Sequence, residues 1–181
     1  MILNRRNFLL GTLAGGCLIG GGAWIGIEPY DESLSIDTAL AKLDKLMLQN
    51  PSTMGEWSLY KIFIHCAQSV EYSMTGYPEH KSDIFKHTAG KAAFLLFSSK
   101  GKMTHSLNEA IPGAPEFSLE ENVAMAFERF KKSLMDFQQY KGVLAPHFAY
   151  GALSKLEYEA AHVMHFNNHL QEIKIAAKPV S

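Results

Sequence analysis

The chain has 181 residues, of which 47% are hydrophobic, and a formal net charge of −1. This length suits one domain plus a targeting segment, and the apolar content is enough for a buried core. The basic residues form no cluster after Arg6, so the sequence lacks the basic face that nucleic-acid binding requires. Cys17 lies in the N-terminal segment and Cys66 in the body, which excludes an internal disulfide in the folded domain.

The first 27 residues have the pattern of an export signal. Two adjacent arginines, Arg5 and Arg6, precede Phe8-Leu9, and an apolar, glycine-rich stretch follows. The pattern resembles the twin-arginine motif, with Asn4 in place of the usual Ser or Thr. We therefore expect recognition by the twin-arginine translocation machinery. The expected location is the periplasm, or the outer face of the cytoplasmic membrane, of a bacterium.

Two questions about this segment stay open. An ordinary Sec signal or a membrane anchor would carry a similar apolar stretch. The stretch is long enough to span a bilayer if it is not removed, and no clean cleavage site follows it. We divide the chain into a signal or anchor, residues 1–27, and a helical domain, residues 28–181.

The domain should begin with a helix from Ser35, whose apolar residues recur at helical spacing until Asn50-Pro51 ends it. A second helix is expected over about Trp57–Met74, and its apolar residues on several faces indicate a central position. A third helix is expected over Ser82–Ser99, followed by an irregular stretch over Lys102–Phe117. The residues of the third helix expected to face inward are Ile84, Phe85, Ala92 and Leu95.

Two Ser-x-x-Glu capping boxes predict the starts of the last two helices. Ser118–Glu121 should open a helix that ends near Gly142, and Ser154–Glu157 should open one that reaches about Ile175. No strand pattern of period two is present. Four long helices plus one extra, joined partly by a long crossover, predict an all-α fold of the four-helix bundle type.

The last predicted helix carries the residues that indicate a metal site. Tyr158, His162, His165 and His169 form one stripe along it. His165 and His169 lie one turn apart and can bind one ion, whereas His162 and His169 are about 10.5 Å apart along the axis, too far for both to join His165 on it. We expect the third ligand to be His65, because an unpaired imidazole would be costly to bury in its apolar segment.

Three imidazoles leave an open coordination position, as in catalytic zinc sites. Cys66 is turned about 100° from His65 around the helix and is not counted as a ligand. Glu71 and Glu159 are available as bases, although the sequence places neither of them near an ion. The ordinary interpretation of these histidines, as hydrogen-bonded core or surface residues, stays open. The histidines in or beside loops, which we expect to be solvent-exposed, are His80, His87 and His105.

Several of these segments resemble the DinB-like (YfiT-like) metal-binding four-helix bundles. The segments that carry the resemblance are Trp57-Ser58-Leu59, Ile64-His65 and His165-x3-His169, and an uncharacterised branch of that superfamily is similar also at Ile111–Pro115 and His147–Ser154. This chain departs from the branch motif because no Pro follows His147 and Asn168 replaces a His. The resemblance implies an up-down-down-up bundle with an extra helix in the crossover, holding one divalent ion, with zinc and nickel the usual candidates.

The resemblance also leaves His147 as a residue that either lines the site or orders its own loop, and we keep His162 and Tyr158 as further residues that could line it. The first hypothesis is a metal-dependent enzyme of hydrolase or thiol-transferase type, since an ion with an open position can activate water or a thiol. The alternatives are a non-catalytic metal-binding or stress-related bundle and a plain structural bundle, because a shared fold does not fix a reaction. The small-molecule substrate and formation of a homodimer stay open.

Overall fold

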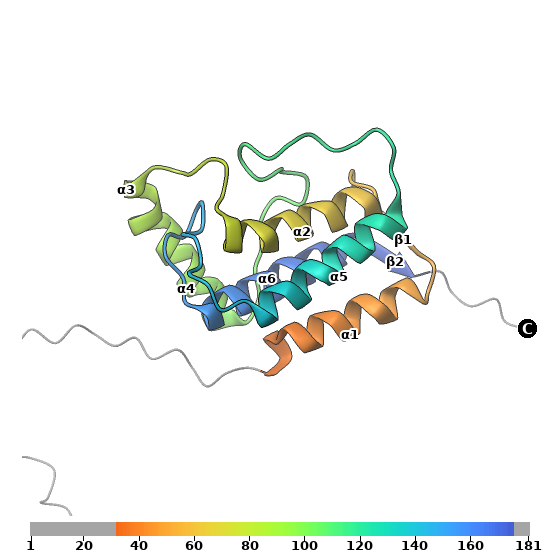
Figure 1. Ribbon diagram of the computed structural model, residues 1–181, viewed down its shortest axis with the longest axis horizontal. Coiled ribbons are helices and arrows are strands. Elements are labelled where there is room, and N and C mark those ends of the chain that lie inside the picture. Colours follow the sequence, from red (N-terminus) through yellow and green to blue (C-terminus); the bar gives the residue numbers. More distant parts are fainter. Residues whose placement is uncertain (1–31, 176–181) are drawn as a thin grey trace, which may run out of the picture.

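The computed structural model describes residues 32–175, so the expected signal with Arg5 and Arg6 lies outside the described residues. Four long helices in this range share one core (Figure 1): α1 (Ile36–Met47), α2 (Leu59–Thr75), α5 (Val123–Gln139) and α6 (Lys155–His169). The shorter elements are a 3-10 turn (Glu32–Leu34), β1 (Pro51–Thr53), α3 (Asp83–Phe85), a π-helical turn (Lys86–Gly90), α4 (Lys91–Lys100), a second 3-10 turn (Leu170–Glu172) and β2 (Ile173–Ile175). The all-α prediction is confirmed. Among the described helices, none is both long and apolar enough to cross a membrane.

The four long helices run in two opposite directions. α1 and α6 are parallel: the N–H of Ile36 at the start of α1 donates to Glu159 near the start of α6 at 2.9 Å. Further along, Lys42 of α1 donates to Asn167 near the end of α6 at 2.9 Å. α5 runs antiparallel to α1, since Lys131 in its middle pairs with Asp44 near the end of α1 at 2.7 Å. Gln138, near the end of α5, donates to Asp37 at the start of α1 at 2.8 Å. α2 shares the direction of α5 (Figure 1). The arrangement therefore brings helices from the two ends of the domain, α1 and α6, side by side.

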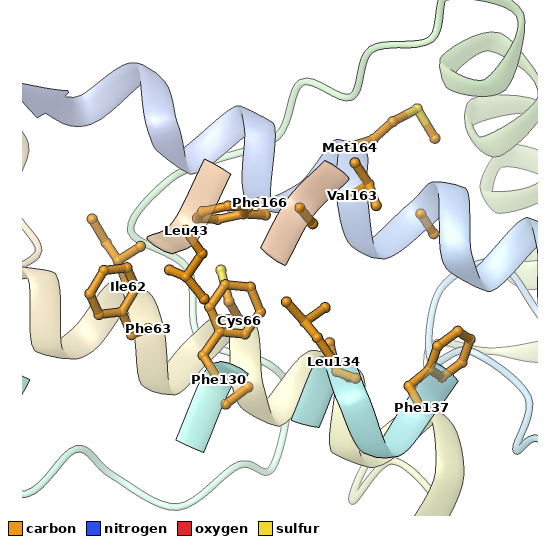
Figure 2. Packing of buried hydrophobic residues seen from close by; sticks show 14 of the residues in the cluster. Leu43, Ile62, Phe63, Cys66, Phe130, Leu134, Phe137, Val163, Met164 and Phe166 are labelled. Atoms are coloured by element: carbon orange, nitrogen blue, oxygen red, sulfur yellow. The ribbon is translucent and has the colours of Figure 1, made fainter. Parts of the chain in front are cut away.

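The long helices meet in a core to which each contributes large apolar side chains. Figure 2 shows Leu43 of α1 packed among residues from the other three helices. α2 is the most buried element, because every residue from 62 to 70 is buried. This confirms the predicted central position. Cys66, only 1% exposed, is part of this apolar packing, and burial raises the pKa of its thiol.

Polar caps begin the four long helices, and one of the two predicted capping boxes is present. Ser154 accepts a hydrogen bond from the N–H of Glu157 while the Glu157 carboxylate accepts one from the N–H of Ser154. The other prediction was wrong: α5 begins five residues after Ser118, at Val123, and its cap is Asn122, which accepts from the N–H of Met125 at 2.9 Å. Ser118 instead accepts from the N–H two residues on, which closes a turn rather than a helix.

The C-terminal end of the domain also differs from the prediction of a helix to about Ile175. α6 ends at His169, and the chain continues through a 3-10 turn into β2. β2 pairs antiparallel with β1, with Thr53 opposite Ile173 and Pro51 opposite Ile175. The pairing offers the backbone of this segment hydrogen bonds that replace further helical ones. The domain is mainly helical, but it contains this one short strand pair, which no period-two pattern in the sequence indicates.

The third predicted helix is interrupted by the π-helical turn. A π-turn holds one extra residue, so it shifts which residues of the following helix face inward, which affects Ala92 and Leu95. Gly90 and Phe94 are buried here, whereas all four residues predicted to face inward are exposed: Ile84, Phe85, Ala92 and Leu95. The π-turn can pack closely against the loop at Ala149 because residue 90 is a glycine. A Cβ at this position would stand 1.9 Å from the backbone oxygen of Ala149.

Candidate metal centre

Three histidines from α2 and α6 meet between the two helices. One ligand nitrogen from each of His65, His165 and His169 lies within 4.8 Å of the other two. The Nε2 atoms of His65 and His165 are 3.0 Å apart. Two nitrogens bound to one ion at about 2.1 Å stand roughly 3.0–3.4 Å apart, so this spacing suits ligands of a single ion.

The hydrogen bonding of these rings is incomplete without an ion. His65 and His169 are 4% and 0% exposed, and both ring nitrogens of His169, as well as Nδ1 of His65, have no hydrogen-bond partner. A buried polar atom without a partner costs free energy, and a metal–nitrogen bond would offset that cost at one of the two ring nitrogens of His169. The three histidines therefore form a donor set that could hold a metal ion.

Burial also keeps the three imidazoles in the form that binds metal. It lowers the pKa of His65 and His165 well below the usual value, and neighbouring histidines lower it further. It lowers the pKa of His169 to about 3, with His105 contributing. Neutral imidazole offers a lone pair, so the cluster needs no deprotonation at neutral pH before it binds an ion.

An indole ring covers the cluster on one side. The ring of Trp57 lies parallel to that of His169 at 6.0 Å and meets the ring of His65 edge-on at 5.0 Å. Trp57 is buried and in turn contacts Phe117. Two residues after it α2 begins, capped by Ser58. This apolar cover limits the access of water to the imidazoles.

Glu172 lies beside His169 and was not identified from the sequence. Its Oε2 atom is buried without a hydrogen-bond partner, 3.8 Å from Nδ1 of His169, and burial is the first cause that raises the pKa of the carboxyl group. That distance is too long for a hydrogen bond. The residue was missed because α6 was expected to continue through it, whereas the 3-10 turn after His169 brings the carboxylate back toward the ring.

His105 is a second residue that sequence reasoning placed wrongly. It was expected to be exposed, but it is partly buried, and its ring centre lies 4.8 Å from that of His165 and 5.3 Å from that of His169. The irregular stretch that carries it has no periodicity from which an inward face could be read. The available signal was the pair of apolar residues Met103 and Ile111, both buried, which anchor this stretch to the core. His80 and His87 are exposed, as expected.

His162, on the predicted histidine stripe, and His147, in the loop before α6, make contacts apart from the three-histidine cluster. His162 is buried and its Nε2 lies 3.2 Å from the hydroxyl of Ser73, so it is not one of the three converging rings. Because that hydroxyl donates to the carbonyl of Val70, Nε2 of His162 acts as the donor. His147 accepts hydrogen bonds at Nδ1 from two N–H groups of its own loop, at 3.1 and 3.2 Å.

A cavity of about 310 Å³ adjoins the cluster. Its wall includes His65, His105 and His165, together with His147 and His162. The rest of its wall is mainly apolar, and the residues that contribute are Phe85, Met103, Ile111, Phe148 and Tyr150. Tyr158 is not part of the wall, and its hydroxyl donates to the carbonyl of Ala145 at 2.7 Å.

The two acidic residues considered as bases are engaged elsewhere. Glu71 forms a two-pronged ion pair with Arg129, at 2.8 and 2.6 Å. Glu159 accepts the N–H of Ile36 at the start of α1. Neither residue lines the cavity next to the histidines. Each therefore stabilises contacts between helices rather than the site.

These features define the class: a helical protein with three close histidines that could hold one metal ion. The chain belongs to the family described as "Protein of unknown function (DUF1569)", whose model matches residues 32–175. Comparison with curated proteins and with solved structures gives no match. The family description assigns no activity, so the site itself must supply the argument for function.

Proposed function

We propose that this protein is a metal-dependent enzyme that holds one divalent ion, zinc or nickel, with His65, His165 and His169. The observation that carries the proposal is the convergence of these three imidazoles, two of which, His65 and His165, line a cavity. Ring nitrogens of His65 and His169 are buried without a hydrogen-bond partner. An ion held by three imidazoles has an open position and can activate water or a thiol, which corresponds to hydrolase or thiol-transferase chemistry.

The cavity indicates the kind of substrate. Its volume of about 310 Å³ lies at the small end of ligand pockets. Most of the wall is apolar, and the charged side chains that contribute are Lys81 and Glu109. The substrate is therefore a small and largely apolar molecule, bound with its reacting group toward the imidazoles. Trp57 and the apolar wall would limit the water around it.

A non-catalytic metal-binding or stress-related protein is the second candidate. The observation that favours it is the position of Glu71 and Glu159, which bond to other helices and leave the site without either expected base. Turnover of chromogenic esters, or of electrophiles offered with a small thiol, separates the two candidates. Activity that a chelator removes and zinc restores supports the enzyme, whereas bound metal with no turnover of either substrate class supports the alternative.

We also propose that the family is part of the DinB-like superfamily. The support is the parallel pair α1 and α6 with α2 and α5 opposite to it, which is the direction pattern of an up-down-down-up bundle. Histidines that face each other from α2 and α6 add to this support. A solved structure whose superposition on DinB-like proteins fails to align these two helices would overturn the assignment.

Export remains a further proposal, supported by the adjacent arginines Arg5 and Arg6. We propose that the twin-arginine machinery carries the protein to the periplasm or to the outer face of the cytoplasmic membrane. Replacing both arginines with Lys should retain the protein in the cytoplasm, as measured by fractionation. Unchanged export of this variant would overturn the twin-arginine route and favour a Sec signal.

The metal content of the purified protein tests the central part of the proposal. Elemental analysis should find about one divalent ion per chain, and His65→Ala, His165→Ala and His169→Ala should each remove most of it. His87→Ala is the matched control, because His87 is exposed, and it should keep the ion. Full occupancy in His65→Ala would refute the three-ligand site, and a wild-type protein without metal would refute metal binding altogether.

A further inference from the structure

We propose that His105 is a fourth ligand, so that the resting site consists of four imidazoles. The inference rests on the proposed metal site and adds a residue to it. His105 comes from the irregular stretch between α4 and α5, not from either helix that supplies the other three rings. Three observations carry the proposal: the position of the ring, the protonation of its two nitrogens, and the contacts that hold its backbone.

The ring of His105 lies next to two of the three rings of the cluster, at centre distances close to those within the cluster. Within the three-histidine cluster the ring centres are 4.8, 5.1 and 5.0 Å apart. The ring of His105 is 4.8 Å from that of His165 and 5.3 Å from that of His169. At these distances its ring borders both proposed ligands from α6.

The hydrogen bonds of His105 assign its two nitrogens different roles. Nδ1 lies 2.5 Å from the backbone oxygen of Ser106, and because a carbonyl can only accept, Nδ1 carries the proton. Nε2 then has the lone pair, and it is buried without a hydrogen-bond partner. A ring nitrogen that donates to a carbonyl while the other faces a metal is the usual arrangement of a ligating histidine.

The backbone around His105 is held from two sides. The side-chain amide of Asn168, a buried residue of α6 next to His169, donates to the carbonyl of His105 at 3.4 Å. Ser106 donates to Asn108 at 2.8 Å, and Asn108 donates to Glu56 at 2.6 Å, beside Trp57. These bonds hold the stretch to α6 and to the segment before α2. The backbone of His105 is therefore held in place although it lies outside the helices.

A fourth imidazole changes what the site can do. Four ligands complete the tetrahedral coordination that zinc prefers, and a site closed in this way has no free position until one ligand leaves. His105 is the ligand that can leave with the least disturbance, because the other three are fixed on packed helices. The wall of the cavity also includes His105, so a molecule in the cavity would meet the ligand it must displace.

X-ray absorption of the zinc-loaded protein tests the proposal, because scattering from the outer ring atoms counts the imidazoles around the ion. We expect four in the wild-type protein and three in both His105→Ala and His105→Phe. The Phe variant keeps the ring volume and so separates lost coordination from a disturbed fold. Zinc affinity, measured by competition with a chelator, should fall in both variants. Loss of a residue that hydrogen-bonds to a metal ligand costs roughly 10–100-fold in affinity, and loss of a ligand should cost at least as much.

His80→Ala is the matched control, because His80 is exposed and lies outside the cluster, and it should leave both the imidazole count and the affinity unchanged. Three imidazoles in the wild-type protein, with affinity unchanged in both His105 variants, would overturn the fourth ligand and leave the three-ligand site intact. A wild-type protein that takes up no zinc would instead overturn the proposed function on which this inference rests.

Discussion

At the scale of single residues, Glu172 places a carboxylate beside the histidine cluster. Its Oε2 atom is 3.8 Å from Nδ1 of His169 and has no hydrogen-bond partner. A carboxylate that hydrogen-bonds to a ligating ring orients that ring and raises its basicity, and we predict that Glu172 makes this bond to His169 when an ion is bound. We predict that Glu172→Gln lowers metal affinity by roughly 10–100-fold while the fold persists. Competition with a chelator measures the change.

The matched control for Glu172→Gln is Glu128→Gln, because Glu128 is exposed on α5, away from the histidines. This variant should bind metal as tightly as the wild-type protein. If Glu172→Gln has wild-type affinity, the carboxylate does not act on His169, and its burial serves the packing of the turn after α6 alone.

The buried histidines outside the cluster predict how stability depends on pH. Burial lowers the pKa of both His147 and His162 to about 3, while the unfolded value is about 6.5. Between these values the unfolded chain binds protons that the folded chain does not, so stability is complete above about pH 6.5 and is lost as the pH falls. Each group should cost on the order of 2 kcal/mol at pH 5 relative to pH 7.5.

Urea unfolding of the metal-free protein at the two pH values checks this prediction. His162→Gln removes one titrating group and keeps an N–H that can donate to Ser73, so its loss of stability between pH 7.5 and pH 5 should be smaller by about 2 kcal/mol. A variant with the same pH dependence as the wild-type protein would show that His162 does not stay neutral in the folded state.

At the scale of elements, the π-helical turn depends on Gly90. Replacing a helical glycine with alanine ordinarily stabilises a protein by up to about 1 kcal/mol. Here a Cβ would stand 1.9 Å from the backbone oxygen of Ala149, which cannot move aside cheaply. We predict that Gly90→Ala lowers stability by about 1–3 kcal/mol, measured by urea unfolding.

Thr88→Ala, in the exposed part of the same turn, is the control for Gly90→Ala and should change stability by roughly 0.5 kcal/mol or less. The site should respond as well, because both Gly90 and Ala149 form part of the cavity wall. A stabilised Gly90→Ala protein would mean that the π-turn and the loop at Ala149 separate easily, and that their contact does not shape the cavity.

The elements also show what local sequence can and cannot predict. The start of α1 at Ser35 and the box at Ser154 were predictable, because a cap and the helix it opens are neighbours in sequence. The same signal at Ser118 failed because Asn122, four residues on, is also a good cap and the helix begins there. The π-turn and the pairing of β2 depend on partners far along the chain, which no local periodicity records.

The site was predictable to the extent that it follows helical geometry. The spacing of His165 and His169, and the burial of His65 in an apolar helix, identified three residues that the structure brings together. His105 and Glu172 could not be found in this way, because one lies in an irregular stretch and the other in a 3-10 turn. Their positions depend on how these segments fold back onto α2 and α6.

At the scale of the whole molecule, metal binding and the proposed export are linked. His65 and His165 are a hundred residues apart and meet only in the folded domain, so the unfolded chain has no preformed site. A twin-arginine route carries folded proteins, which would let the cytoplasm, where free copper is scarce, choose the metal. We predict that the exported protein carries zinc or another non-copper ion.

Two samples test this link: protein exported normally, and protein refolded in a periplasm-like mixture that contains copper. The refolded sample should bind copper, because the Irving–Williams order favours copper at an all-imidazole site. If both samples carry the same metal, the site selects the ion by itself and the export route has no part in the choice.

The most direct test of the central claim is anomalous X-ray scattering at the absorption edge of the bound metal, from crystals of the protein purified from its own compartment. We predict one strong peak between α2 and α6, about 2.1 Å from a ring nitrogen of each of His65, His165 and His169. The absence of a peak there, or a peak bound by other residues, would contradict the claim that these three histidines hold a metal ion.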